Sequence, residues 1–237
     1  MIQAINNNSP VLILGMHRSG TSCLAGCLEQ AGLFLGNVNR QAEFNKKGNH
    51  ENLAIMEFND QILFRVGAAW DRPPNAVVEL TAPEKHRIQQ LRASYPVNTA
   101  WGVKDPRILL LFEAWEQEIH PRLVGTFRHP AEVMNSLLRR ASAWGQRMNE
   151  TEAFNLWRVY NERLLRIHHT RPFPLVRFDQ EPTAYRAAVA STARALGLPG
   201  LTKESFFDSI LRSNYKTDTP IPDTVKPVWN ELLSRST

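Results

Sequence analysis

The sequence of 237 residues predicts an α/β fold built on a mainly parallel sheet with helices on both of its faces. Short apolar runs, which are typical of strands buried on both faces, alternate along the chain with longer segments whose apolar residues recur at helical spacing. No internal repeat, low-complexity tract or linker interrupts this alternation. We therefore expect a single domain over residues 1–237.

The expected elements follow in order along the chain. A strand over residues 11–14 runs into a turn that contains glycine and then into a helix that Gly32 ends, which is the opening of a βαβ unit. Polar residues 36–52 form a long loop. Further strands are expected at residues 101–103, 123–127 and 174–178. Further helices are expected from the capping box at Thr81 to about Tyr95, from Pro130, over residues 151–169 and over residues 185–196. From residue 214 onward, three prolines break the helical pattern and predict a tail over residues 214–237 that wraps the body.

The charge balance indicates an anionic partner. Lys and Arg number 28 against 23 Asp and Glu, a formal net charge of +5, which favours a nucleotide, a nucleic acid, an anionic lipid or an acidic glycan. The first residues lack the pattern of a secretory leader, and no stretch approaches the about 18 apolar residues of a membrane span. Cys23 and Cys27 share one helix face and fall short of a metal set. We expect a cytoplasmic protein with no membrane span.

The turn after the first strand reads GMHRSGTS over residues 15–22, close to the phosphate-binding pattern GxxxxGK[ST] but with Thr21 in place of the lysine. Backbone N–H groups of such a turn and of the helix that follows present partial positive charge to a phosphate. The basic residue of this turn is instead Arg18. The missing lysine, together with the lack of an evident Asp for magnesium at a strand end, disfavours ATPase or kinase chemistry.

Two further basic motifs follow predicted strands. The run KDPR occupies residues 104–107, and Arg128 follows the strand that ends at Phe127, with Ser136 eight residues beyond it. Ser136 is about two turns into the next helix, so that a nucleotide crossing the sheet edge can touch both Arg128 and Ser136. Because the carboxyl ends of parallel strands meet at one edge, we expect all three motifs to lie at the edge where α/β proteins bind ligands.

These motifs resemble those of sulfotransferases that use 3′-phosphoadenosine 5′-phosphosulfate (PAPS). Residues 18–22 resemble the 5′-phosphosulfate loop, in the arginine form common in carbohydrate and tyrosylprotein sulfotransferases. Arg128 and Ser136 resemble the element that binds the 3′-phosphate, and residues 104–106 resemble the Lys-Asp-Pro element whose lysine is placed near the transferring sulfuryl group. The resemblance covers roughly residues 10–180 and implies a three-layer, P-loop-like fold.

The resemblance implies transfer of a sulfuryl group from PAPS to a hydroxyl acceptor, with release of adenosine 3′,5′-bisphosphate (PAP) and no metal. It assigns stabilisation of the transferring group and of the leaving oxygen to Arg18 and Lys104. It assigns donor binding to a larger set, namely Arg18, Ser19, Gly20, Thr21, Ser22, Arg128 and Ser136. Residues 45–52 resemble an Asn-x-x-Gly-x-x-Glu segment whose glutamate is the proposed base. That role falls on Glu51, with the adjacent His50 as competitor, although family members have aromatic residues where this chain has Asn49 and His50.

Several alternatives remain open at this stage. A glycan, a glycolipid or a small-molecule alcohol is the acceptor expected by analogy with the family, with no nucleic acid as partner. One rival function is a P-loop nucleotide-dependent phosphotransferase, and another is a non-catalytic nucleic-acid-binding module that uses the basic edge. The run WDRPP at residues 70–74 fits either an acceptor entrance or a packed tryptophan followed by a turn.

Overall fold

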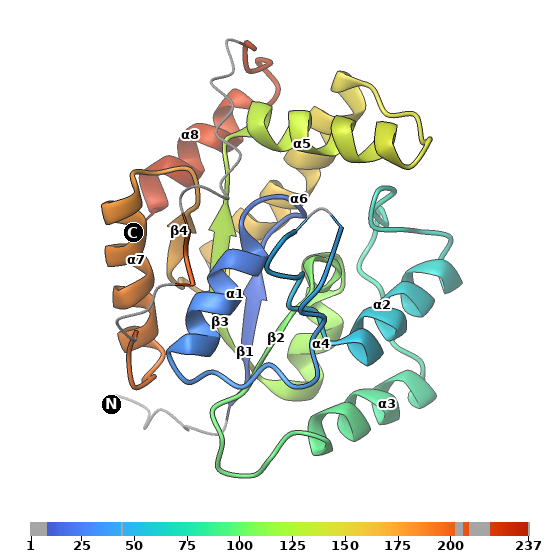
Figure 1. Cartoon of the computed structure of the whole chain (residues 1–237). Helices are drawn as coiled ribbons and strands as arrows, with labels where there is room; N and C mark the ends of the chain where they lie inside the picture. The colour runs from blue at the N-terminus through green and yellow to red at the C-terminus, as the bar shows by residue number, and fades with distance from the viewer. Residues whose placement is uncertain (1–8, 44, 202–205, 209–218, 237) are drawn as a thin grey trace.

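A four-stranded parallel sheet forms the centre of the molecule (Figure 1). We describe it from a computed structural model, in which residues 9–43, 45–201, 206–208 and 219–236 are described. The strands lie in the order β2-β1-β3-β4, and each neighbouring pair is parallel, so the predicted mainly parallel sheet is confirmed. Their bounds are β1 (Val11–Leu14), β2 (Gly102–Lys104), β3 (Arg122–Phe127) and β4 (Leu175–Arg177).

Helices cover both faces of the sheet and complete three layers. They are α1 (Thr21–Gln30), α2 (Leu53–Arg65), α3 (Ala82–Ala93), α4 (Phe112–Ile119), α5 (Pro130–Ala143), α6 (Glu150–Thr170), α7 (Pro182–Ala195) and α8 (Lys226–Arg235), with a 3₁₀ turn over Pro106–Leu110. Alternate residues of β1 enter different cores. Val11 and Ile13 pack with α1 and α7, whereas Leu12 and Leu14 pack with the helices of the opposite layer. Figure 1 shows α1 and α6 on opposite sides of the sheet.

Local capping explains where several helices begin. The Thr81 hydroxyl accepts a hydrogen bond from the backbone N–H of Glu84, and the Glu84 carboxylate accepts one from the backbone N–H of Thr81. These two bonds confirm the predicted capping box. Asn149 and Glu152 form a second box at the start of α6. Asn52 caps α2 by accepting from two backbone N–H groups.

The sequence patterns do not predict α2, α4 or α8. Pro227 lies in the first turn of α8, where the backbone N–H that a proline lacks would have no partner within the helix. The prediction that this proline breaks the helical pattern was therefore wrong. The Trp229 ring of α8 contacts the ring of Phe127 at a centroid distance of 5.7 Å. Of the predicted tail, residues 214–218 and 237 lie outside the described residues.

The parallel order brings the ends of β1, β2 and β3 to one edge of the sheet. Lys104 is the last residue of β2, the 15–20 turn follows β1, and Arg128 follows β3 directly. The expectation that the three basic motifs share this edge is therefore confirmed. Among the helices of the described residues, none is long and apolar enough to cross a membrane.

Candidate active site

The turn between β1 and α1 is shaped so that only glycine fits at two positions. A Cβ at Gly15 would lie 2.5 Å from the carbonyl oxygen of Thr126, and one at Gly20 would lie 2.3 Å from the Phe178 ring. Gly20 and Arg18 both have positive φ, 87° and 66°. Gly20 is the N-cap of α1 and provides no side-chain cap, so the first N–H groups of the helix are left for an anion.

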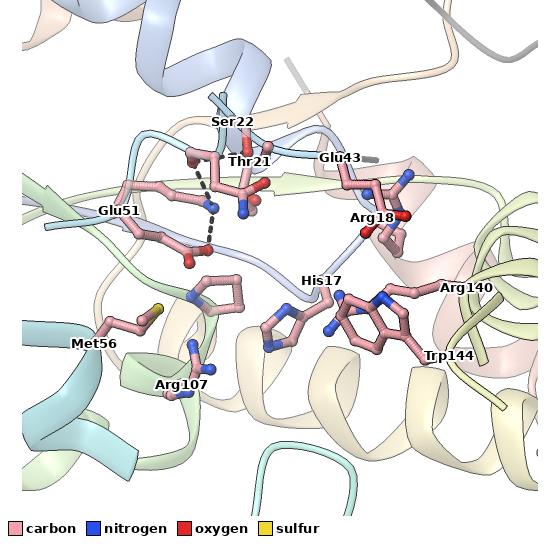
Figure 2. A pocket seen from close by; sticks show the side chains of 14 residues that line it. His17, Arg18, Thr21, Ser22, Glu43, Glu51, Met56, Arg107, Arg140 and Trp144 are labelled. Carbon is pink, nitrogen blue, oxygen red and sulfur yellow. Dashed lines mark hydrogen bonds and ion pairs between the residues drawn. The ribbon is translucent and has the colours of Figure 1, made fainter. Parts of the chain in front are cut away.

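A cavity of about 260 Å³ opens beside this turn (Figure 2). Four segments contribute to its wall: the turn itself, residues 42–56 of the long loop and the start of α2, the end of β2, and the end of α5. The predicted site residues Arg18, Thr21, Ser22, Glu51 and Lys104 all line it. The cavity therefore joins two of the three predicted motifs with the segment that carries the predicted base.

Glu51 and Lys104 form a buried ion pair at the cavity wall, with 2.6 Å between Oε1 and Nζ. Lys104 also donates to the carbonyl oxygen of Asn49 at 3.0 Å, and Ser22 donates to the same oxygen at 2.9 Å. An ammonium group has three donors, so one N–H of Lys104 lacks a partner among the described residues. Oε2 of Glu51 likewise accepts no hydrogen bond from the described residues.

His50, the alternative base, is directed away from the cavity. Its Nε2 lies 2.9 Å from the carbonyl oxygen of Lys47, and its Nδ1 lies 3.3 Å from a carboxylate oxygen of Glu29 on α1. Burial raises the pKa of Glu29, but the interactions with His50 and Arg40 outweigh that effect and lower the pKa to about 2. His50 thus anchors the long loop to α1, and of the two candidate bases Glu51 is the one that lines the cavity.

Arg18, Ser136 and Arg128 come together on the other side of the turn. The Arg18 Nε donates to the Ser136 hydroxyl at 2.8 Å, and Arg128 donates to the Arg18 carbonyl oxygen at 3.4 Å. Arg128 is also paired with Glu132 at 2.6 Å, one turn into α5. The residues expected to bind the two ends of the donor are therefore in direct contact across 118 residues of sequence.

Positive charge is concentrated around Arg18. Burial, and then repulsion from Arg140, Arg128 and Arg139, together lower the pKa of Arg18 to about 10. Within this cluster, Arg128 is paired with Glu132. A polyanion bound between Arg18 and Arg128 would relieve their mutual repulsion, so these two arginines have the electrostatics of a phosphate site.

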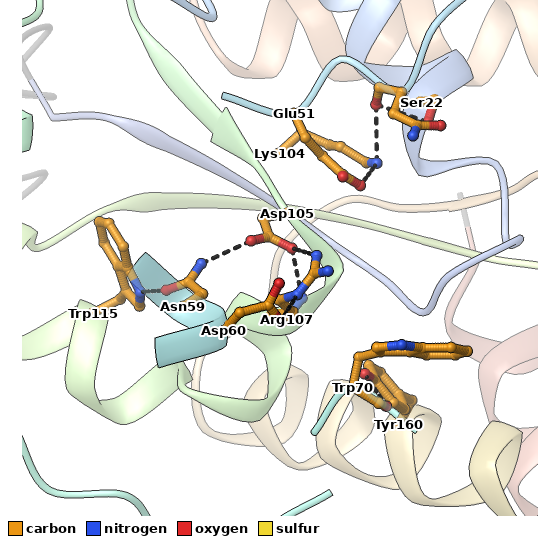
Figure 3. Close-up of polar contacts among 11 residues, drawn as sticks. Ser22, Glu51, Asn59, Asp60, Trp70, Lys104, Asp105, Arg107, Trp115 and Tyr160 are labelled. Atoms are coloured by element: carbon orange, nitrogen blue, oxygen red, sulfur yellow. Dashed lines mark hydrogen bonds and ion pairs between the residues drawn. The ribbon is translucent and has the colours of Figure 1, made fainter. Parts of the chain in front are cut away.

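Asp105 braces the segment after β2 rather than facing the cavity (Figure 3). Its carboxylate accepts from the backbone N–H and the guanidinium of Arg107, at 3.0 and 3.1 Å, and from the Asn59 amide at 2.8 Å. Asn59 in turn accepts from the Trp115 indole at 2.9 Å, and Arg107 also pairs with Asp60. This network fixes the end of β2, and with it Lys104.

Several residues of the cavity wall were not among the site residues expected from the sequence, namely His17, Arg107, Arg140 and Trp144. His17 lies inside the recognised turn, and Arg140 lies one helical turn beyond Ser136, which are the signals that were available. Trp70 packs against His17, with 4.8 Å between ring centroids. Across the described part of the chain, no group of three or more metal-binding side chains is present.

Comparisons with known proteins agree with this fold. A scan against protein-family models found no match, and a search of curated proteins also found none. Among solved structures, the chain is similar to the sulfotransferase domain from the Synechococcus PCC 7002 olefin synthase, at 15% identity and a TM-score of 0.55, over 94% of each chain. At this identity the likeness shows the fold alone, and the predicted three-layer α/β architecture is confirmed.

Proposed function

We propose that this protein is a sulfotransferase that uses PAPS as donor and a hydroxyl compound as acceptor. The observation that carries the proposal is the Lys104–Glu51 pair in a cavity beside a phosphate-binding turn that lacks the usual lysine. One cation and one carboxylate are the groups needed to stabilise a leaving oxygen and to accept a proton. The fold shared with a sulfotransferase domain supports the same proposal.

The donor is bound through its two phosphate ends. Backbone N–H groups of residues 18–22 hold the 5′-phosphosulfate at the start of α1. Arg128 and Ser136 hold the 3′-phosphate, and the Arg18 guanidinium, bonded to Ser136, adds charge between the two ends. When no donor is bound, Arg128 pairs with the Glu132 carboxylate. The 3′-phosphate of the donor then replaces Glu132 as the partner of Arg128.

Transfer follows from the positions of Lys104 and Glu51. The acceptor oxygen attacks sulfur, the bond from sulfur to the 5′-phosphate oxygen breaks, and the electron pair leaves on that oxygen, which gives PAP. The remaining N–H of Lys104 stabilises the charge on the leaving oxygen. The acceptor proton moves to Oε2 of Glu51, and the scheme needs no metal.

The remaining parts of the proposal concern context. A glycan, a glycolipid or a small-molecule alcohol is the acceptor class, without nucleic acid as partner. The chain acts as a single domain over residues 1–237 in the cytoplasm, where its two thiols, which are free in the structure, stay reduced.

Thermal unfolding with added nucleotide tests the donor. We expect PAP to raise the melting temperature more than ATP with magnesium does, because PAP presents both phosphate ends to the site. Transfer of ³⁵S from labelled PAPS to fractionated host extract then tests the reaction. Stronger stabilisation by ATP with magnesium would favour the phosphotransferase. Tight, steeply salt-dependent binding of DNA or RNA that survives Arg128→Ala would favour the nucleic-acid module.

A further inference from the structure

One arginine of the cavity wall is held between two tryptophans. The Arg140 guanidinium lies 4.1 Å from the centroid of the Trp144 ring and 4.9 Å from that of Trp70. Cation–π contacts of this kind fix the plane of a guanidinium while leaving its N–H groups directed outward. In Figure 2, Arg140 and Trp144 lie across the cavity from Glu51, with His17 between them.

Arg140 forms no ion pair within the described residues. Its Nε is buried without a hydrogen-bond partner there, and no described carboxylate forms an ion pair with it. Two other arginines near the cavity differ, since Arg128 is paired with Glu132 and Arg107 with Asp60 and Asp105. Burial lowers the pKa of Arg140, and the charges of Glu51 and Asp71 offset that effect only in part. An anion in the cavity would supply the missing partner.

His17 adds a neutral polar group to the same part of the cavity. Its side chain is buried, and its Nε2 has no hydrogen-bond partner among the described residues. Burial, and then repulsion from Arg107, Arg140, Lys104 and Arg18, hold its pKa well below 6.5. The neutral imidazole presents one donor and one acceptor and does not add to the positive charge at pH 7.

We propose that Arg140, oriented by Trp70 and Trp144, binds an oxyanion group of the acceptor, so that the substrate class is an anionic hydroxyl compound. This inference rests on the proposed function, because it takes Glu51 and Lys104 as the place of transfer. The acceptor hydroxyl lies at Glu51 and its carboxylate, or another oxyanion, lies at Arg140. Arg140 is then a specificity residue separate from the donor site at Arg128 and Ser136.

The test uses hydroxy acids, each paired with its own neutral amide, for example 4-hydroxyphenylacetate and 4-hydroxyphenylacetamide. Binding to the protein saturated with PAP is followed by tryptophan fluorescence, and turnover by ³⁵S transfer from PAPS. We expect the wild type to prefer the acids by about tenfold or more, as a charge-assisted hydrogen bond allows. Arg140→Gln should remove this preference and leave PAP affinity within about twofold. Arg147→Gln, a neighbouring exposed arginine, is the matched control and should keep the preference.

Three results would overturn the inference. The wild type could bind acids and amides equally, or bind no acid. The Arg140→Gln variant could keep the preference for acids, or it could lose PAP affinity as Arg128→Ala does. The last result assigns Arg140 to the donor. Arg140→Lys retains the charge but not the planar fork, so it serves if Arg140→Gln fails to fold. If the wild type neither binds PAP nor transfers sulfate, the proposed function fails. Fluorescence titration with the acids and the amides in the absence of PAP then still measures whether the cavity prefers the anionic compound.

Discussion

The ammonium group of Lys104 lies 2.6 Å from the carboxylate of Glu51, although 53 residues separate them in sequence. Lys104 ends β2, and Glu51 precedes the capping residue of α2. The pair therefore joins the sheet edge to the long loop in the absence of substrate. One N–H of Lys104 and Oε2 of Glu51 have no hydrogen-bond partner among the described residues. The predictions for this pair depend on these two groups.

Glu51→Gln should lower the rate of sulfate transfer by about 10²–10⁴-fold, because an amide cannot accept the acceptor proton but can still accept the bond from Lys104. PAP affinity, measured by calorimetry, should stay within about twofold. Glu57→Gln, at an exposed position of α2, is the matched control and should retain full activity. Unchanged turnover in Glu51→Gln would remove this carboxylate from the proposed mechanism.

Arg128 and Glu132 should change PAP affinity in opposite directions. Arg128→Ala should weaken binding by about 2 kcal/mol, or roughly 30-fold, because it removes a charge-assisted bond to a phosphate. Glu132→Gln should strengthen binding a few-fold, because it removes the carboxylate that holds Arg128 in the structure. Calorimetric titration with PAP measures both. If the pair is purely structural, both variants lower the melting temperature and neither alters the dissociation constant.

Gly20→Ala should destabilise the fold by about 2–3 kcal/mol, which corresponds to a fall of roughly 5–10 °C in the melting temperature. Two costs add: the positive φ of 87°, and contact of the new Cβ with the Phe178 ring. Gly67→Ala isolates the first cost, since Gly67 has a φ of 69° with no atom within 4 Å of the added Cβ. Equal losses in the two variants would show that the Phe178 contact relaxes without cost.

The stability of the protein should fall in acid partly through Glu29. Its pKa of about 2 in the folded protein lies below the ordinary 4.5, so the unfolded chain binds a proton first as the pH falls. The stabilisation is present above about pH 4.5 and is lost between about pH 4.5 and 2. Urea unfolding at several pH values should show a shallower acid loss for Glu29→Gln. Parallel curves for the variant and the wild type would mean that the contacts of Glu29 with His50 and Arg40 do not persist in solution.

Local patterns predict most of the fold. Each predicted strand is present, because a short buried apolar run between turn residues has few other solutions in an α/β chain. The helix beginning at Pro130 is also predicted well, since Val133, Met134 and Leu137 mark its buried face. Pro227 shows the limit of the same signals: proline ends a helix or begins one according to its position, and position depends on tertiary packing.

The cavity was harder to predict than the fold. The turn at residues 15–22 and the motifs at Lys104 and Arg128 are found because each follows a strand. Arg140 comes from a segment with no motif, and it reaches the cavity wall only through the packing of α5, which brings its guanidinium to 4.9 Å from the centroid of the Trp70 ring. Periodicity shows which side of α5 is buried, but it does not show what the other residues face.

The central position of β1 has a consequence for how the chain is made. β1 is synthesised first, but both of its neighbours, β2 at residues 102–104 and β3 at residues 122–127, emerge much later. At about 5–20 residues per second, the apolar run VLIL waits roughly 5–20 s with both edges unpaired, a state that favours aggregation. Recombinant production should therefore gain from slower translation or added chaperone, and a soluble truncation has to extend beyond residue 127.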